Sequence, residues 1–197
     1  RDKLVTGVQT CALPILDNVS IPDIAKTVRD YADKKYDVII AQGYEWGDPI
    51  LKLANDYPHT KFIVFTGLVK SKNIVSIFPR QQEAAFLLGA LGSMLSKNHT
   101  IGFIGGDQKY PNLKNIYEGY KHGAQYINPK SKVLESYVGD WDNQTKGRLA
   151  GLSQIEKGAD FLLQVADNAG QGVIQAAKEK GVYAFGAVSD QNKLAPD

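Results

Sequence analysis

Short apolar runs alternate with amphipathic stretches along most of the chain, and this alternation begins at Leu16. The stretch IPDIAKTVRDYADKK (21–35) has apolar residues at helical spacing, whereas YDVIIAQG (36–43) is a continuous apolar run that ends in glycine. The first pattern predicts an amphipathic helix, and the second predicts a strand that is buried on both faces. The two patterns recur with a period of roughly 25–30 residues, about the length of one strand and one helix with their loops.

The recurring pattern predicts an α/β fold with parallel sheets. The predicted strands cover residues 36–43, 61–67, 73–79, 100–106, 132–139, 159–167 and 182–190. The predicted helices cover residues 21–35, 48–57, 80–97, 112–127, 143–158 and 170–181. Strands that alternate with helices indicate a doubly wound parallel sheet with helices on both faces and right-handed crossovers.

The pattern favours two α/β lobes, with a boundary near Lys97 to His99, where a long apolar helix ends and a strand-first unit begins. The first lobe then covers residues 16–98 and the second covers residues 99–197. The first fifteen residues, RDKLVTGVQTCALPI, follow neither period and resemble translated adaptor sequence, so we interpret residues 1–15 as a non-native scar. By this interpretation Cys11 is non-native, and both lobes are partial because the chain is an internal fragment.

Composition and charge exclude several classes of protein. A formal net charge of +2 gives no electrostatic basis for binding nucleic acid or an acidic membrane surface. One cysteine and three widely spaced histidines suggest neither a disulfide framework nor a zinc site, and we expect no metal and no cofactor. No run approaches the roughly 18 apolar residues of a membrane span.

Aromatic and polar side chains gather in the loops that follow the predicted strands. Ligands of open parallel sheets bind beyond the carboxyl ends of the strands. The candidate ligand-binding residues in these loops are Tyr44, Trp46, Phe78, Asp107, Trp141, Asn168 and Asp190. Flat aromatic rings with amide and carboxylate groups suit a neutral, planar or hydroxylated ligand. The alternatives are that the two tryptophans plug the lobes, that Asp48 and Asp142 cap helices, and that Arg80 pairs with Glu83.

The stretch TIGFIGGDQKYPN (100–112) has the shape of a phosphate-binding loop but not its residues. It lacks the lysine and hydroxyl residue of a P-loop and the spacing of a dinucleotide fingerprint. Asp107 stands where a phosphate would lie and would repel it. No G-x-S-x-G motif and no histidine placed for a catalytic triad is present, so the sequence predicts binding without catalysis.

Several stretches of the chain carry a more specific combination of motifs. They are YDVIIAQGYEWGDPI, FPRQQEAAFLLGALGSML, GFIGGDQKYPNLKNIYEGYKHGAQYINP, GDWDNQTKG, QVADNAGQGVIQAAKEKGVYAFG and SDQN. In this combination the chain, from about Leu16 to Asp197, resembles the basic membrane lipoprotein family. These proteins are substrate-binding components of bacterial ABC importers, similar to the purine-nucleoside receptors.

The resemblance implies a type I periplasmic-binding-protein fold, in which two α/β lobes close over a ligand in the cleft between them. It implies a nucleoside or related small solute as ligand, an ABC permease as partner, and a lipid anchor outside the cytoplasmic membrane. It assigns ligand-facing positions to Trp46, Asp107 and Asp190. An effector-binding domain of a regulator and an α/β hydrolase of sugars or nucleosides remain alternatives.

The chain also departs from the family pattern. Val188 stands where the family usually has an aspartate, and DNAGQG (167–172) replaces the GGTGLG of purine-binding members. A sugar or another small solute therefore remains an alternative to a nucleoside. If residues 1–15 replace the first strands of the family, the first lobe lacks a central strand and exposes apolar side chains, which predicts aggregation and weak ligand binding.

Overall fold

The computed structural model describes residues 3–5, 8–10, 14–16, 19–187 and 189–195. The chain forms two compact units, Arg1–Pro79 and Arg80–Asp197, called unit 1 and unit 2 below. The boundary between the two units therefore falls before the long apolar helix. The sequence suggested a boundary after that helix, near Lys97 to His99. That helix, α3 (Gln81–Leu95), belongs to unit 2 because its backbone packs against α4 (Pro111–Ile127).

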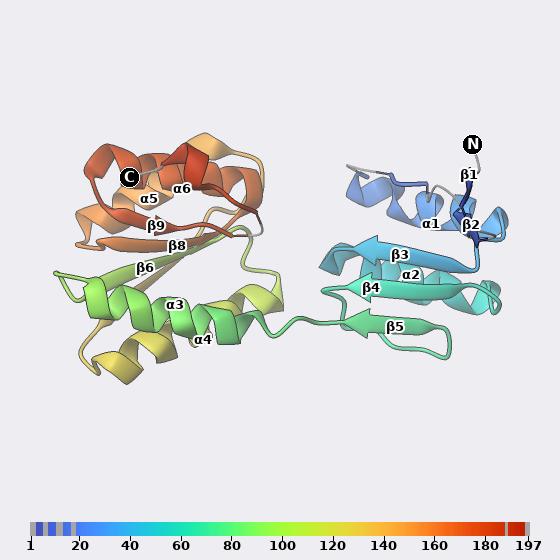
Figure 1. Ribbon diagram of the computed structural model, residues 1–197, viewed down its shortest axis with the longest axis horizontal. Coiled ribbons are helices and arrows are strands. Elements are labelled where there is room, and N and C mark those ends of the chain that lie inside the picture. Colours follow the sequence, from blue (N-terminus) through green and yellow to red (C-terminus); the bar gives the residue numbers. More distant parts are fainter. Residues whose placement is uncertain (1–2, 6–7, 11–13, 17–18, 188, 196–197) are drawn as a thin grey trace. The chain divides into compact units, whose positions relative to one another are not determined.

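Unit 1 contains a three-stranded parallel sheet in the order β3-β4-β5. Its strands are β3 (Val38–Gln42), β4 (Lys61–Phe65) and β5 (Ile74–Ile77), and its helices are α1 (Ile24–Asp33) and α2 (Gly47–Leu53) (Figure 1). The core of the unit combines the apolar side of α1 and α2 with alternate residues of the strands, such as Ile39, Phe62 and Ile74.

The opposite face of this sheet carries exposed apolar side chains. Val38, Ile40, Val75 and Ile77 expose 49%, 60%, 60% and 40% of their surfaces. The segment predicted to be buried on both faces thus forms a strand, β3, with alternating exposed and buried residues. The reason is that α1 and α2 pack with the residues of only one face.

Unit 2 contains a four-stranded parallel sheet in the order β7-β6-β8-β9. The strands are β6 (Thr100–Gly105), β7 (Lys132–Tyr137), β8 (Phe161–Val165) and β9 (Tyr183–Phe185), and the remaining helices are α5 (Gln144–Glu156) and α6 (Asp167–Lys180). In Figure 1, α5 and α6 lie above the sheet and α3 and α4 lie below it. With both faces covered, all six residues of β6 are buried, as the sequence predicts for a central parallel strand.

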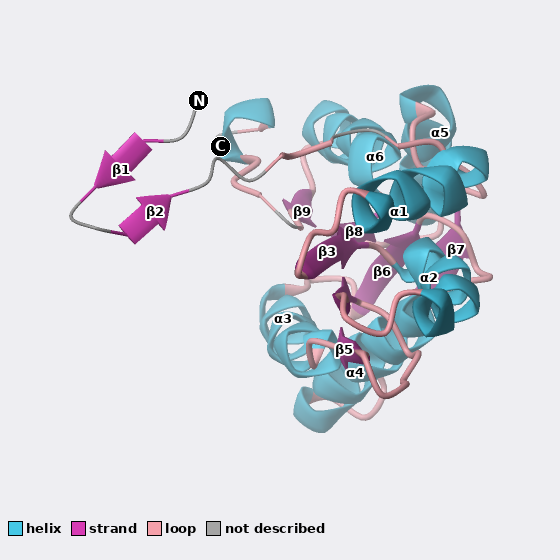
Figure 2. Ribbon diagram, turned by 90° about the vertical axis from the view of Figure 1, so that its right-hand side faces the viewer, coloured by secondary structure: helices cyan, strands magenta, loops and turns pink. Residues whose placement is uncertain are grey.

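Close approach of helix backbones defines the packing of α3 on α4, which lie side by side in Figures 1 and 2. A Cβ atom on Gly89 of α3 would overlap the carbonyl oxygen of Tyr120, and one on Gly123 of α4 would overlap that of Phe86. The two helices therefore meet backbone to backbone. Glycines of α5 and α6 meet the facing backbone in the same way, at Gly147 and elsewhere.

Two short strands near the start of the chain, β1 (Lys3–Val5) and β2 (Val8–Thr10), pair with each other in a sheet of their own. Cys11 lies outside the described residues. The interpretation of residues 1–15 as a non-native scar stays a prediction, which sequencing of the complete gene would test. No helix within the described part of the chain is both long and apolar enough to span a membrane.

Candidate functional site

Loops at the carboxyl ends of the strands form the candidate site, and strand register explains why they come together. In unit 2, Gly105 pairs with Tyr137 on one side and with Val165 on the other, so β6, β7 and β8 end at the same level. The segments that follow, residues 106–110, 138–143 and 166–168 (the last at the start of α6), are called the unit 2 rim. Backbone bonds join them: Gly106 N donates to Val165 O (2.9 Å), and Gly139 N donates to Gly106 O (2.7 Å).

Trp141 is the half-buried centre of this rim. Its indole packs on the backbone of Gly106, where a Cβ atom would collide with the ring. It also meets Tyr110 edge to face, with ring centroids 5.3 Å apart. The Trp141 carbonyl oxygen accepts a hydrogen bond from Ala169 N (2.9 Å), at the start of α6. Two neighbouring strands and one helix thus hold this aromatic residue at the edge of the sheet.

Asp140 and Asn143 shape the turn that presents Trp141. The Asp140 carboxylate accepts hydrogen bonds from the backbone N–H of Asp142 (3.0 Å) and from Lys146 Nζ (3.2 Å), which together lower the pKa of Asp140. Asn143 caps α5 by accepting a hydrogen bond from Lys146 N (3.0 Å). The predicted cap at Asp142 is wrong, because Asp142 instead accepts a hydrogen bond from Asn168 Nδ2 (3.0 Å).

Asp107 carries a compensated charge in the structure. Its carboxylate accepts a hydrogen bond from Lys109 N (3.1 Å) and pairs with Lys109 Nζ (2.9 Å), which lowers the pKa of Asp107. The sequence-based argument that Asp107 repels phosphate is weakened, because the adjacent ammonium offsets the negative charge. Arg80, the other candidate for binding anions, pairs with Glu83 (2.8 Å), as the alternative interpretation predicts.

The rim of unit 1 holds the remaining aromatic candidates. Tyr44 and Trp46 lie in a 3-10 turn (Tyr44–Trp46) directly after β3, and Phe78 directly follows β5. All three side chains are half-buried. Trp46 packs against the core of unit 1, so it contributes to packing there whatever else it contacts. The predicted helix cap at Asp48 is wrong, since α2 already begins at Gly47 and Asp48 lies in its first turn.

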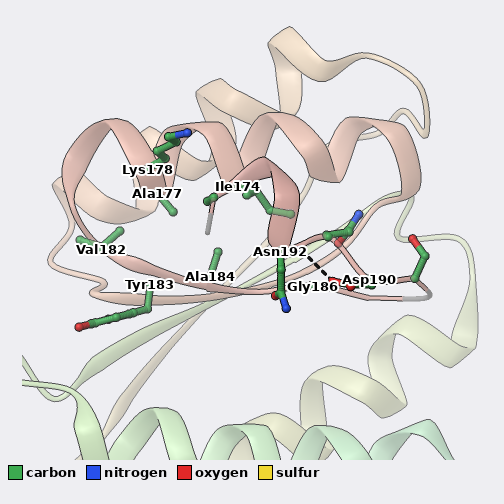
Figure 3. Close-up of a pocket in the computed structure, with 12 residues that line it drawn as sticks. Ile174, Ala177, Lys178, Val182, Tyr183, Ala184, Gly186, Asp190 and Asn192 are labelled. Atoms are coloured by element: carbon green, nitrogen blue, oxygen red, sulfur yellow. Dashed lines mark hydrogen bonds between the residues drawn. The ribbon is translucent and has the colours of Figure 1, made fainter. Parts of the chain in front are cut away.

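Asp190 lies in the segment after β9 and is exposed. It lines a hollow of about 390 Å³ between this segment and α6, together with residues such as Ile174, Lys178 and Tyr183 (Figure 3). Asp107, Trp141 and Asn168 do not line this hollow. The structure therefore brings those three together at the unit 2 rim and places Asp190 beside α6. Val188, the departure from the family pattern, lies outside the described residues.

Asp167 is a further rim residue, which the sequence places after a strand without assigning it to the ligand. It adopts a φ of 47°, in the left-handed region that non-glycine residues rarely occupy. Desolvation, and then the nearby charge of Asp142, raise the pKa of Asp167. A strained backbone and a perturbed carboxyl group often mark functional sites. The sequence shows only an aspartate at a strand end and cannot show either property.

We expect Asp167→Asn to increase stability near pH 7. The folded-state pKa of Asp167 lies above the unfolded value, so its contribution to stability is present below the unfolded pKa and is lost as pH rises through the folded pKa. Asparagine carries no charge and tolerates a positive φ. Urea unfolding should show the variant to be more stable than wild type at pH 7, with a smaller difference near pH 4. An equal difference at both pH values would contradict the titration argument.

Three features of the described residues bear on function. No three histidine, cysteine, aspartate or glutamate side chains among them come together as metal ligands. Each unit carries aromatic and hydrogen-bonding groups at the carboxyl edge of a parallel sheet. Such edges hold ligands in α/β proteins. The fold is that of the type I periplasmic binding proteins.

The comparisons with known proteins identify the family. The sequence profile of the family described as "ABC transporter substrate-binding protein PnrA-like" matches residues 6–197. The chain belongs to this family, which confirms the resemblance found in the sequence.

The chain is similar to three curated relatives over most of its length. Basic membrane protein D of Borreliella burgdorferi is 32% identical, covering 91% of this chain and 56% of the relative. A purine-binding protein of Brucella abortus is 29% identical, covering 92% of this chain and 51% of the relative. The transcriptional activator protein med of Bacillus subtilis is 27% identical, covering 87% of this chain and 53% of the relative. The chain thus spans about half the length of these relatives.

A solved structure agrees with the fold. The ABC transporter solute-binding protein of Aeropyrum pernix superimposes with a TM-score of 0.82 at 22% identity, covering 90% of this chain and 53% of that chain. At this identity the likeness concerns the fold alone.

Proposed function

We propose that this chain is part of an extracytoplasmic solute-binding protein of an ABC importer and binds a small uncharged solute of the nucleoside class. The observation that carries the proposal is the unit 2 rim, where the indole of Trp141 packs on Gly106 and the neighbouring side chains of Asp142 and Asn168 are hydrogen-bonded to each other. An aromatic face suits a planar base, and carboxylates accept hydrogen bonds from sugar hydroxyls. The similarity to a purine-binding protein supports a nucleoside over other solutes.

We extend the proposal to Trp46, Asp107 and Asp190, which the family resemblance assigns to the ligand, and to Tyr44 and Phe78, which follow strands of the unit 1 sheet. The other parts of the proposal follow from the family. An ABC permease receives the solute, and a lipid anchor holds the protein at the membrane. The solute leaves chemically unchanged, as the substrate-binding character of the family implies.

The test is a binding experiment with adenosine, guanosine, inosine, uridine, ribose and myo-inositol. Calorimetry should detect saturable binding of at least one nucleoside, and chromatography of the mixture should recover that nucleoside intact. Saturable binding of ribose or myo-inositol alone would show that the ligand is a sugar or polyol and not a nucleoside. Recovery of free base and ribose would show that the protein is a hydrolase and not a binding protein.

Trp141→Ala should weaken nucleoside binding by about tenfold to a hundredfold, because stacking of a base on an aromatic side chain contributes about 1–3 kcal/mol. The matched control is Tyr126→Ala, which removes an aromatic residue that is 78% exposed near the end of α4. The rim joins α4 at its N-terminal end, next to Tyr110, whereas Tyr126 lies at the C-terminal end, so the control should leave the affinity unchanged. Equal affinities for wild type and Trp141→Ala would contradict the role of the indole.

A second function is favoured by one observation. The similarity to the transcriptional activator med of Bacillus subtilis supports an effector-binding domain of a regulator on the same fold. A permease gene next to the gene for this protein would favour the importer, and solute-dependent DNA binding by the complete gene product would favour the regulator.

A further inference from the structure

Gln164 is a buried amide near the end of a central strand. It precedes the last residue of β8, which lies between β6 and β9, and its side chain is 1% exposed. A buried amide costs free energy unless its donor and acceptor find partners. The neighbouring positions of β8, Leu162 and Leu163, are buried leucines, so an amide at position 164 needs a reason other than core packing.

The hydrogen bonds of Gln164 connect β8 to the segment after β9. Its Oε1 accepts a hydrogen bond from Ala166 N (3.2 Å), and its Nε2 donates to Gln191 Oε1 (2.8 Å). Gln191 Oε1 also accepts a hydrogen bond from Ala187 N (3.1 Å). Gln164 therefore holds Gln191 directly, and Gln191 in turn holds the Ala187 amide.

Two glycines leave room for this pair of amides. A Cβ atom on Gly170 of α6 would overlap the Gln164 amide, and one on Gly186 would lie 2.8 Å from Gln191 Oε1. The neighbour of Gln191 in the chain is Asp190, whose Oδ1 accepts a hydrogen bond from Asn192 N (3.0 Å) (Figure 3). The backbone on both sides thus leaves space for the amide pair, and Asp190 is the chain neighbour of one of its two members.

We infer that Gln164 is a positioning residue that orders the loop carrying Asp190 before solute binds. The inference rests on the proposed function only in assigning Asp190 to the solute. An ordered loop binds more tightly than a mobile one, because the cost of ordering it has already been met. Leucine at position 164 would fill a similar volume but would remove one of the two hydrogen bonds that Gln191 Oε1 accepts, and with it the tie between β8 and the segment that carries Asp190.

The first measurement uses no solute. We expect Gln164→Leu to accelerate hydrogen exchange at the Ala187 amide by about tenfold, as the loss of a buried hydrogen bond and its local order predicts. The matched control is Gln154→Leu. Gln154 is also a buried glutamine of unit 2, 3% exposed, but its Nε2 donates to Phe103 O (2.9 Å) and Ser136 Oγ (2.8 Å). The control should leave exchange at Ala187 unchanged.

Gln191→Leu provides a second variant in case Gln164→Leu fails to fold. Gln191 is only partly buried, and its loss removes both the bond to Gln164 and the bond from Ala187 N. It should accelerate exchange at Ala187 to a similar extent. Unchanged exchange at Ala187 in Gln191→Leu, or equal acceleration in Gln154→Leu, would overturn the inference.

The second measurement uses inosine as probe. Gln164→Leu should weaken binding by about tenfold, the factor that corresponds to one hydrogen bond, whereas Gln154→Leu should not. Faster exchange with unchanged inosine affinity would show that Gln164 orders the loop but that the loop does not contact the solute, and would overturn the positioning role. If wild type binds no nucleoside, the proposed function fails while the exchange experiment still decides whether Gln164 orders the loop.

Discussion

Gly89→Ala should lower the free energy of unfolding of unit 2 by about 3 kcal/mol, even though alanine is the better helix former. The added methyl group would overlap the carbonyl oxygen of Tyr120, an atom of the facing backbone that cannot rotate away. Separation of α3 from α4 is the only relief, and it opens contacts along both helices. Gly123→Ala, which brings a methyl group against the Phe86 carbonyl from the other side, should have an effect of similar size.

The measurement is urea unfolding followed by tryptophan fluorescence in a Trp46→Phe background, in which Trp141 reports on unit 2 alone. The control is Ala84→Gly at an exposed position of the same helix, which should cost about 1 kcal/mol because glycine is the poorer helix former. Stabilisation by Gly89→Ala would mean that the intrinsic preference for alanine prevails and that the two backbones do not meet.

Replacing Ile40 and Val75 together by threonine should reduce aggregation of this chain strongly. Both residues are 60% exposed, and they pair with Ile63 from either side, so the three form one row across the uncovered face of β3-β4-β5. Exposed apolar patches of this kind promote association. Threonine keeps the β-branched shape that suits a strand while adding a polar group.

Light scattering and binding of an apolar dye, measured at equal protein concentration, should both fall in this double variant. Val64→Thr serves as control: Val64 is fully buried on the packed face of the same sheet, so its replacement should destabilise unit 1 by about 1–3 kcal/mol and increase dye binding. A wild-type chain that melts cooperatively, shows a normal ligand-induced shift and binds no dye would contradict the prediction of aggregation and weak binding.

Secondary structure was predictable because its causes are local. All seven predicted strands are present as β3 to β9, and each predicted helix is present with shifted ends. One clear shift is at α6, which begins at Asp167 and not at Gly170, because a left-handed Asp167 starts the helix directly after β8. Sequence patterns indicate helix existence more reliably than such backbone details at helix ends.

The positions of the candidate residues were predictable in outline, and their role in binding stays a prediction. The rule that ligands bind at the carboxyl ends of parallel strands selected Trp141, Asp107 and Asn168, and the structure brings these three together at one rim. Partners of the individual groups were not predictable. Lys109 compensates Asp107, and Asn143 takes the capping role expected of Asp142, since both outcomes depend on turn geometry that residue types alone do not specify.

The sequence by itself determined the alternation of strands and helices, the positions of the strand-end loops and the family, because these depend on hydrophobic periodicity and on motifs of adjacent residues. Only the tertiary structure decided that α3 packs with α4 in unit 2, that one face of β3-β4-β5 is uncovered, and that Gln164 bonds to Gln191 across 27 positions of the chain. Each of these depends on contacts between distant residues, which form only when the sheets and helices have assembled.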